Sequence, residues 1–229
     1  MISGLQGVVL NVTDETFGAM GQSTFLTAGG DAVGGFINGA LFRRPTSADD
    51  SKAGSGVFRD LYTVKDSSTS PTNPQEGYNR DGAIDAKVAN GFDPYLTVSG
   101  LVEDTSGSAY VFVIDTNEAG NTPEKFISLD DFEIFLGGAT DPDPLPTSAV
   151  GLPTALGPAV YSMSPDAEQN HVLLDYSLFS GSGQMDLFVF VPKSVFAGAN
   201  PDDQVFIYTR FGTYGAQPGF DPSAGAEQV

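Results

Sequence analysis

The sequence predicts an all-β protein, a single antiparallel β-sandwich that is jelly-roll-like and carries long decorated loops. Short runs rich in Val, Ile, Phe and Tyr recur along the chain, and Gly, Pro, Asn, Asp and Ser separate them, which is typical of sandwiches and jelly rolls. Helical periodicity is nearly absent. A chain of 229 residues suits one large all-β domain, so we expect residues 1–229 to form one sandwich.

Ten segments are candidate strands, because each is a short apolar or alternating run bounded by turn residues. In chain order they are residues 6–13, 35–43, 56–64, 95–102, 109–115, 132–136, 159–163, 171–178, 185–191 and 205–211. Alternation is cleanest in "NHVLLDYSL", where Val172, Leu174 and Tyr176 lie on one face and His171 and Asp175 on the other. The run "QVFIYTRF" is apolar at almost every position, which predicts a central strand covered on both faces.

Three stretches between these strands are predicted loops. Residues 43–56 and 65–94 are polar and rich in helix and strand breakers, and the second is long enough to be an ordered excursion or a functional loop. Residues 137–159 carry five prolines and are interpreted as a crossover between two sheets rather than a domain linker. Short helical turns are expected in "AKVANG", in "PKSVFAG" and at the start of "TPEKFISLDDFE".

The charge of the chain is strongly acidic, with 29 acidic and 10 basic residues and a net charge of −19. Nucleic acids and anionic membranes are polyanions, so this charge predicts that neither is a partner.

The apolar runs are too short for a transmembrane helix, which predicts no membrane insertion. The chain has no Cys, which favours a secreted bacterial protein without disulfides. The N-terminus lacks the features of a signal peptide, so we expect either a mature chain or another route.

Little in the sequence predicts catalysis, and we expect no enzyme. His171 is the only His, it lies on an apolar strand, and no nucleophile elbow is present. A glycosidase needs only two carboxylates, so the many acidic residues leave that class open, although nothing marks a pair. The absence of Trp disfavours a carbohydrate site, and leaves Tyr78, Tyr95 and Tyr214 as the available stacking surfaces.

The segment "YVFVIDTNEAGNTPEKFISLDDFEIFLGG", residues 110–138, places an acidic turn-rich middle between two apolar runs. Dense oxygen ligands beside strand ends are what Ca²⁺ requires, although Ala119 and Phe126 stand where an EF-hand loop has ligands. The alternative is that the same side chains only cap a turn. We expect at least one Ca²⁺ site, with ligands drawn from Asp115, Asn117 and Asp130, or in second place Asp141 and Asp143.

Four phrases of the chain occur together in one order: "GSGVFRDLYTV … EGYNRDG", "YVFVIDTNEAGNTPEKFISLDDFEIFLG", "LLDYSLFSGSGQMDLFVFVPKSVF" and "QVFIYTRFG … SAGAEQV". Across residues 54–229 they resemble secreted bacterial proteins of the PEP-CTERM, exosortase-sorted type. Val229 replaces the terminal Trp of that group, and no sorting tail of Pro-Glu-Pro, apolar helix and basic cluster follows. The resemblance implies an extracellular, β-rich surface or matrix protein associated with exopolysaccharide, and it implies no catalytic residues.

Together these observations predict a non-enzymatic, extracellular or cell-surface structural protein of a biofilm matrix or filament. Its expected partners are further copies of itself, as a homopolymer, or exopolysaccharide. The alternative is a calcium-dependent carbohydrate-binding module. The predicted strand within residues 1–13 either pairs in its own sheet or completes the sheet of a neighbour, and the second arrangement would build a filament by strand donation.

Overall fold

We describe the protein from a computed structural model. The structure describes residues 7–13, 25–26, 33–46, 49, 61–65, 74–88, 93–118, 120, 124–138, 140–142, 144–165, 169–179, 183–212, 214, 220, 222 and 227–229. Within them, no helix is long and apolar enough to cross a membrane.

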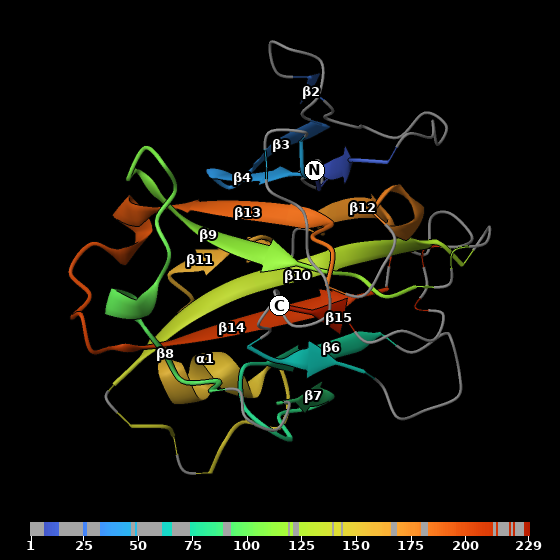
Figure 1. Ribbon diagram of the computed structural model, residues 1–229. Helices are drawn as coiled ribbons and strands as arrows, with labels where there is room; N and C mark the ends of the chain where they lie inside the picture. The colour runs from blue at the N-terminus through green and yellow to red at the C-terminus, as the bar shows by residue number, and fades with distance from the viewer. Residues whose placement is uncertain are drawn as a thin grey trace, which may run out of the picture.

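Two large sheets and one small sheet make up the fold (Figure 1). The first sheet has the order β1 (Val9–Asn11), β12 (His171–Asp175), β10 (Phe126–Gly137), β14 (Gln204–Phe211) and β6 (Gln75–Tyr78), with β11 (Tyr161–Ser162) on β10 and β8 (Leu96–Thr97) on β14. The second has the order β2 (Phe25–Leu26), β3 (Val33–Ile37), β4 (Ala40–Arg43), β13 (Leu187–Pro192) and β9 (Ala109–Ile114). The small sheet has the order β15 (Glu227–Gln228), β5 (Thr63–Val64) and β7 (Ala86–Lys87).

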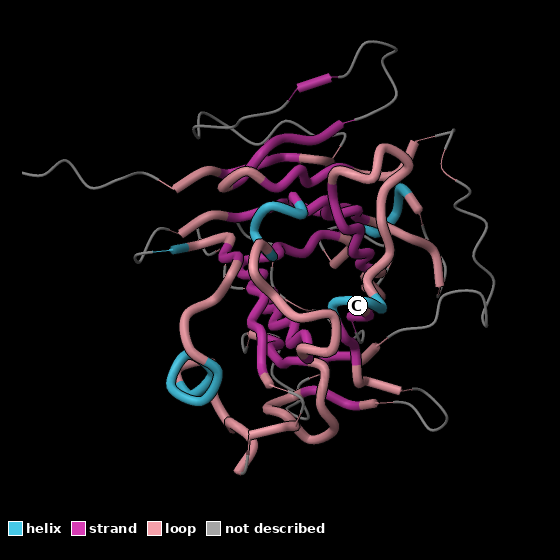
Figure 2. Tube along the Cα trace, turned by 90° about the vertical axis from the view of Figure 1, so that its left-hand side faces the viewer, coloured by secondary structure: helices cyan, strands magenta, loops and turns pink. Residues whose placement is uncertain are grey.

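The two large sheets face each other across an aromatic core. The ring of Phe132, on β10, lies 6.3 Å from Phe42 of β4 and 5.6 Å from Phe112 of β9, measured between centroids. Figure 2 shows the strands in stacked layers, with loops around their ends. Every described strand pairing is antiparallel except β1 with β12. The predicted all-β, sandwich-like fold is confirmed.

The central strands follow the predicted apolar runs. Strand β14 is buried at every residue except Arg210, as expected for a run covered on both faces. Strand β10 begins six residues earlier than the predicted 132–136, because its first half pairs with β12 and its second half with β14. The register shifts between Leu129 and Asp131, so Asp130 occupies a bulge.

Three local predictions are wrong. Residues 35–43 form two strands rather than one, because Asn38 and Gly39 both take positive φ (49° and 85°) and close a tight hairpin between β3 and β4. In "AKVANG", Ala86 and Lys87 form strand β7, where a helical turn was predicted. Residues 137–159 were predicted to cross between two sheets, but they return to the sheet they left, because β11 pairs with β10; they contain the short helix α1 (Gly151–Leu156), whose Leu152 is fully buried against the core.

Other boundaries are shorter than predicted. The runs 95–102 and 171–178 each leave the sheet early, in 3-10 turns over Val98–Gly100 and Tyr176–Leu178. The turn expected in "PKSVFAG" is present as a 3-10 turn over Lys193–Phe196. At the N-terminus, β1 pairs in parallel with β12 of its own chain, and residues 1–6 lie outside the described residues. Exchange of this strand between subunits therefore stays a prediction.

Candidate metal centre

Three strand ends meet beside the first acidic residue of the 110–138 segment. Asp115 directly follows β9 and Asp186 directly precedes β13, and because Ile114 pairs with Leu187, the two carboxyl-bearing residues flank the same end of the sheet. The backbone N–H of Asp186 donates to the Ile114 carbonyl over 2.9 Å. Asp115 exchanges two backbone hydrogen bonds with Gln228 of β15, of 3.0 and 2.8 Å. The C-terminal strand is thereby brought to the end of the second sheet.

Four buried carboxyl groups gather at this junction, which we call the carboxylate cluster. They belong to Asp115, Glu118, Asp186 and Glu227, with exposed fractions of 0, 5, 4 and 0%. Burial of a carboxylate is costly unless hydrogen bonds or an opposite charge compensate it. A cation bound at the cluster would compensate these buried charges.

Backbone N–H groups and one hydroxyl donate hydrogen bonds to one oxygen in each of three of these carboxylates. The N–H and hydroxyl of Thr116 both donate to Asp186 Oδ2 over 2.7 Å, and the N–H of Asn117 donates to Glu227 Oε2 over 2.9 Å. The N–H of Gly183 donates to Asp115 Oδ2 over 2.6 Å. These bonds fix the carboxylates in place.

The second carboxylate oxygens of Asp186 and Glu227 accept no hydrogen bond from the described residues. Asp186 Oδ1 and Glu227 Oε1 are buried, and no donor reaches either of them within the described part of the chain. An unsatisfied buried oxygen of this kind costs about 1–3 kcal/mol, and more if it is charged. Both oxygens are therefore suited to a ligand that brings positive charge.

Burial raises the carboxyl pKa values of two members of the cluster. Burial raises the pKa of the Asp186 carboxyl well above its ordinary value; hydrogen bonds from Thr116 oppose this and the charges of Asp115 and Asp175 add to it. Burial also raises the pKa of Glu227, and the nearby Glu118 carboxyl raises it further. At both residues, burial therefore favours the protonated carboxyl over the carboxylate.

The described side chains do not already form a closed coordination shell. In the part of the chain that the structure describes, no group of three or more Asp, Glu, His or Cys side chains is placed to hold a metal ion. The carboxylates fit Ca²⁺ by chemistry, because it takes six to eight oxygens in adaptable geometry and completes its shell with carbonyls and water. An ion at this junction would therefore take part of its coordination shell from backbone carbonyls and water.

The structure distributes the predicted ligands over separate places. Asp115 belongs to the carboxylate cluster, and Asn117 touches it through its backbone N–H. Asp130 instead places Oδ1 2.7 Å from His171 Nδ1, and Asp141 accepts hydrogen bonds of 2.7–2.9 Å from the Arg80 guanidinium. Asp143 lies outside the described residues. Asp130 and Asp141 are thus already matched to basic side chains.

Sequence reasoning missed three members of the cluster: Glu118, Asp186 and Glu227. Glu118 stands in the acidic segment and could have been included on ligand density alone. Glu227 is 110 positions from Asn117, the residue whose N–H it accepts, so no local spacing reveals the contact. Asp186 has one available signal, since an acidic residue directly before a buried apolar strand lies at a sheet end.

His171 is part of a pair with Asp130, packed against the Tyr214 ring at 4.7 Å. We expect His171→Ala to leave every biological activity intact, because the ring bonds to Asp130 and no Ser, Thr or Cys side chain bonds to it within the described residues. The variant should lose stability, since Asp130 gives up a buried partner, by about 1–3 kcal/mol. Urea unfolding and hydrolysis assays of the variant test this. Loss in the variant of a polysaccharide or ester hydrolysis shown by the parent would contradict it.

A second acidic group lies on the face of β10 that points away from the aromatic core. Asp131 pairs across the sheet with Arg210 at 3.8 Å, and Glu133 accepts a hydrogen bond of 3.0 Å from Ser162. Burial, aided by the Glu133 charge and opposed by Arg210, raises the pKa of Asp131 to about 7. Asp131 therefore changes its charge near neutral pH.

This titration predicts a pH-dependent stability. The folded pKa of Asp131, about 7, exceeds its ordinary 3.8, so the folded state binds the proton more tightly. The contribution is complete below pH 3.8 and is lost as the pH rises to about 7, by about 2–4 kcal/mol. We expect Asp131→Asn to raise the free energy of unfolding at pH 8 and to leave it unchanged at pH 4. Urea titrations at both pH values measure this, with exposed Asp202→Asn as the control. An equal effect at both pH values would contradict it.

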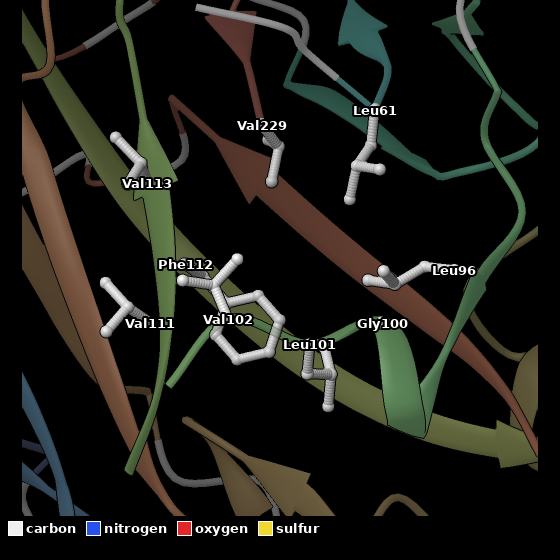
Figure 3. Close-up of a pocket in the computed structure, with 9 residues that line it drawn as sticks. All are labelled: Leu61, Leu96, Gly100, Leu101, Val102, Val111, Phe112, Val113 and Val229. Atoms are coloured by element: carbon white, nitrogen blue, oxygen red, sulfur yellow. The ribbon is translucent and has the colours of Figure 1, made fainter. Parts of the chain in front are cut away.

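An apolar pocket of about 240 Å³ lies beside the C-terminal residue. Figure 3 shows Leu61, Leu96 and Val229 across the hollow from Phe112 and Leu101. The pocket is smaller than most small-molecule sites, which measure about 300–1,000 Å³. Its wall depends on the same C-terminal segment that carries Glu227.

Comparisons with known proteins add no assignment: no family model, curated protein or solved structure matches the chain.

Proposed function

We propose that this chain is a non-enzymatic structural protein of a bacterial cell surface, biofilm matrix or filament, stabilised by calcium. The observation that carries the proposal is the carboxylate cluster, which gathers buried negative charge where three strands end. Extracellular calcium modules typically bind with dissociation constants of about 10⁻⁴–10⁻³ M, which suits a protein that meets millimolar calcium outside the cell. The resemblance of residues 54–229 to exosortase-sorted proteins supports the same location.

Self-association is the expected mode of action. A subunit with a net charge of −19 repels its copies, so assembly needs cations together with continuous contacts. Strand β1 lies at an edge of the first sheet and contributes only Val9–Asn11, and edge strands are templates for pairing with another chain. Donation of the N-terminal strand to a neighbour is the route that we propose for assembly.

A calcium-dependent carbohydrate-binding module is the alternative, and the tyrosines weigh against it. Tyr78 is buried and donates its hydroxyl to the Pro146 carbonyl over 2.8 Å, and Tyr214 is only 5% exposed. Tyr95 is 58% exposed, but its ring stacks on the Arg80 guanidinium at 4.6 Å. Of the three stacking surfaces expected from the sequence, one is available to a sugar.

The experiment is sedimentation velocity and negative-stain imaging of the purified full chain in calcium, in magnesium and in EDTA. We expect filaments or large oligomers in calcium, and their loss when residues 1–13 are deleted. A monomer at high concentration in calcium would contradict the structural role, and binding to a glycan array by that monomer would favour the carbohydrate module.

A further inference from the structure

We propose that Asp186 and Glu227, together with Asp115 and Glu118, bind one divalent cation, calcium, and that this ion fixes the C-terminal strand β15 to the sandwich. The inference rests on the calcium stabilisation proposed above and names its site and its structural consequence. Three of these four residues lie outside the set of ligands that the sequence predicts.

The first step is that the two key carboxylates are fixed but not saturated. Thr116 and Asn117 hold Oδ2 of Asp186 and Oε2 of Glu227, so neither side chain has to be ordered when an ion arrives. The other oxygen of each is buried without a donor within the described residues. A preorganised carboxylate with one open oxygen is what a monodentate calcium ligand requires.

The second step is that the negative charge of the four carboxylates favours binding of a divalent cation. The Asp115 and Asp175 carboxyls raise the pKa of Asp186, and the Glu118 and Asp186 carboxyls raise that of Glu227. Asp175 has its own counterion, since Lys125 Nζ lies 2.8 Å from its Oδ2. Four carboxylates at one junction therefore repel one another.

The identity of the cation follows from the ligand type. Oxygen ligands favour calcium or magnesium over zinc, which prefers the nitrogen and sulfur of His and Cys. The chain has no Cys, and its single His is bonded to Asp130. Magnesium requires near-ideal octahedral geometry and gives up water reluctantly, whereas calcium adapts to carboxylates that do not already converge.

The third step concerns what the ion would hold. Strand β15 has only two residues, and it pairs with β5 at Val64 and Thr63 and with Asp115 through a single bridge. So short a strand has few hydrogen bonds of its own, while its Glu227 side chain is completely buried among like charges. The Glu118 and Asp186 carboxyls disfavour a charged Glu227 at this position, so a cation bound there would strengthen the attachment of the strand.

Val229 links this strand to the apolar pocket. It is 5% exposed, accepts a backbone hydrogen bond from Leu61, donates one to the Tyr62 carbonyl, and lines the pocket opposite Phe112 (Figure 3). Release of β15 would therefore also open one wall of the pocket to water. An ion at Glu227 would stabilise both the strand and this apolar contact.

The test uses the full chain after EDTA treatment, with CaCl₂ and MgCl₂ as the probes. We expect calorimetric titration to give one calcium per chain and hydrogen exchange to show that the C-terminal peptide becomes protected when calcium binds. Glu227→Gln and Asp186→Asn should each weaken calcium binding by about tenfold or more. Both are isosteric and keep the acceptor used by Asn117 or Thr116, so both variants should fold.

The same variants separate an ion site from a purely structural role. In EDTA each should melt at the same temperature as the parent or higher, because one buried like charge is removed, while in calcium each should lose the gain shown by the parent. Asp141→Asn serves as the matched control. Asp141 is paired with Arg80, so this substitution should leave calcium binding unchanged. A structural carboxylate would instead destabilise the protein equally in both buffers.

Several outcomes would overturn the inference: no calcium binding by the treated protein, unchanged binding by both variants, or equal C-terminal protection in calcium and EDTA. If calcium binds and protects β15 but the protein stays monomeric, the site stands and the proposed structural function fails. If the protein assembles into filaments without binding calcium at these residues, the function stands and the site fails.

Discussion

Phe132→Ala should lower the free energy of unfolding by about 3–5 kcal/mol, the usual cost of truncating a buried aromatic side chain. Phe132 is completely buried on the central strand β10. Its ring packs against Phe42 and Phe112 on the opposite sheet and against Tyr161, whose ring centroid lies at 6.2 Å. The truncation therefore leaves a cavity in the middle of the interface between the two large sheets. Urea unfolding followed by circular dichroism measures the loss.

The matched control is Phe36→Ala. Phe36 lies on β3 and is 63% exposed, so its truncation should change the free energy of unfolding by less than about 0.5 kcal/mol. Equal costs for the two substitutions would mean that Phe132 does not lie between the sheets.

Arg80→Met should lower the free energy of unfolding by about 3 kcal/mol, because it breaks a buried, multiply bonded ion pair. Arg80 is 2% exposed and donates to Asp141, to the side chain of Gln204 and to the backbone carbonyls of Asn79 and Pro94. Met keeps much of the apolar stem but leaves these acceptors without their donor. Chemical denaturation at neutral pH measures the difference.

The control for Arg80 is Lys193→Met, which removes an exposed pair with Glu103. Exposed pairs contribute little, so the unfolding midpoint should stay within experimental error. The double variant Arg80→Met with Asp141→Leu should recover part of the loss, since no carboxylate then lacks its partner. A midpoint for Arg80→Met equal to that of the parent would show that the buried network does not stabilise the fold.

Strands that coincide with long apolar runs could be predicted from the sequence. Strands β9, β13 and β14 match predicted segments because each is an apolar run that must be buried in a sheet. The hairpin between β3 and β4 was also predictable, since Asn38-Gly39 is the strongest short hairpin pair, and the alternating residues around it obscured the turn.

The short strands were not predictable. Strands β5, β7 and β15 have two residues each, and two residues carry neither a period nor a hydrophobic pattern. They exist because distant segments supply backbone partners, as when Glu227 pairs with Val64. The residues next to each of these strands in the sequence therefore cannot predict such a pairing.

The candidate site was partly predictable for the same reason. Asp115 could be found because acidic turn residues at a strand end concentrate oxygen ligands in one short segment. Asp130 and Asp141 satisfied the same rule, yet the fold brings His171 and Arg80 to them. Whether an acidic residue meets a cationic side chain or another carboxylate depends on long-range pairing.

The most direct test of the central claim is the melting temperature of the full chain in millimolar calcium, with magnesium and EDTA as controls. A ligand present at 100 times its dissociation constant stabilises the folded state by about 2.7 kcal/mol. For a chain of this size, that gain corresponds to a rise of about 5–10 °C. The account predicts this rise in calcium, and its loss in Glu227→Gln. The same melting temperature in calcium, magnesium and EDTA would contradict it.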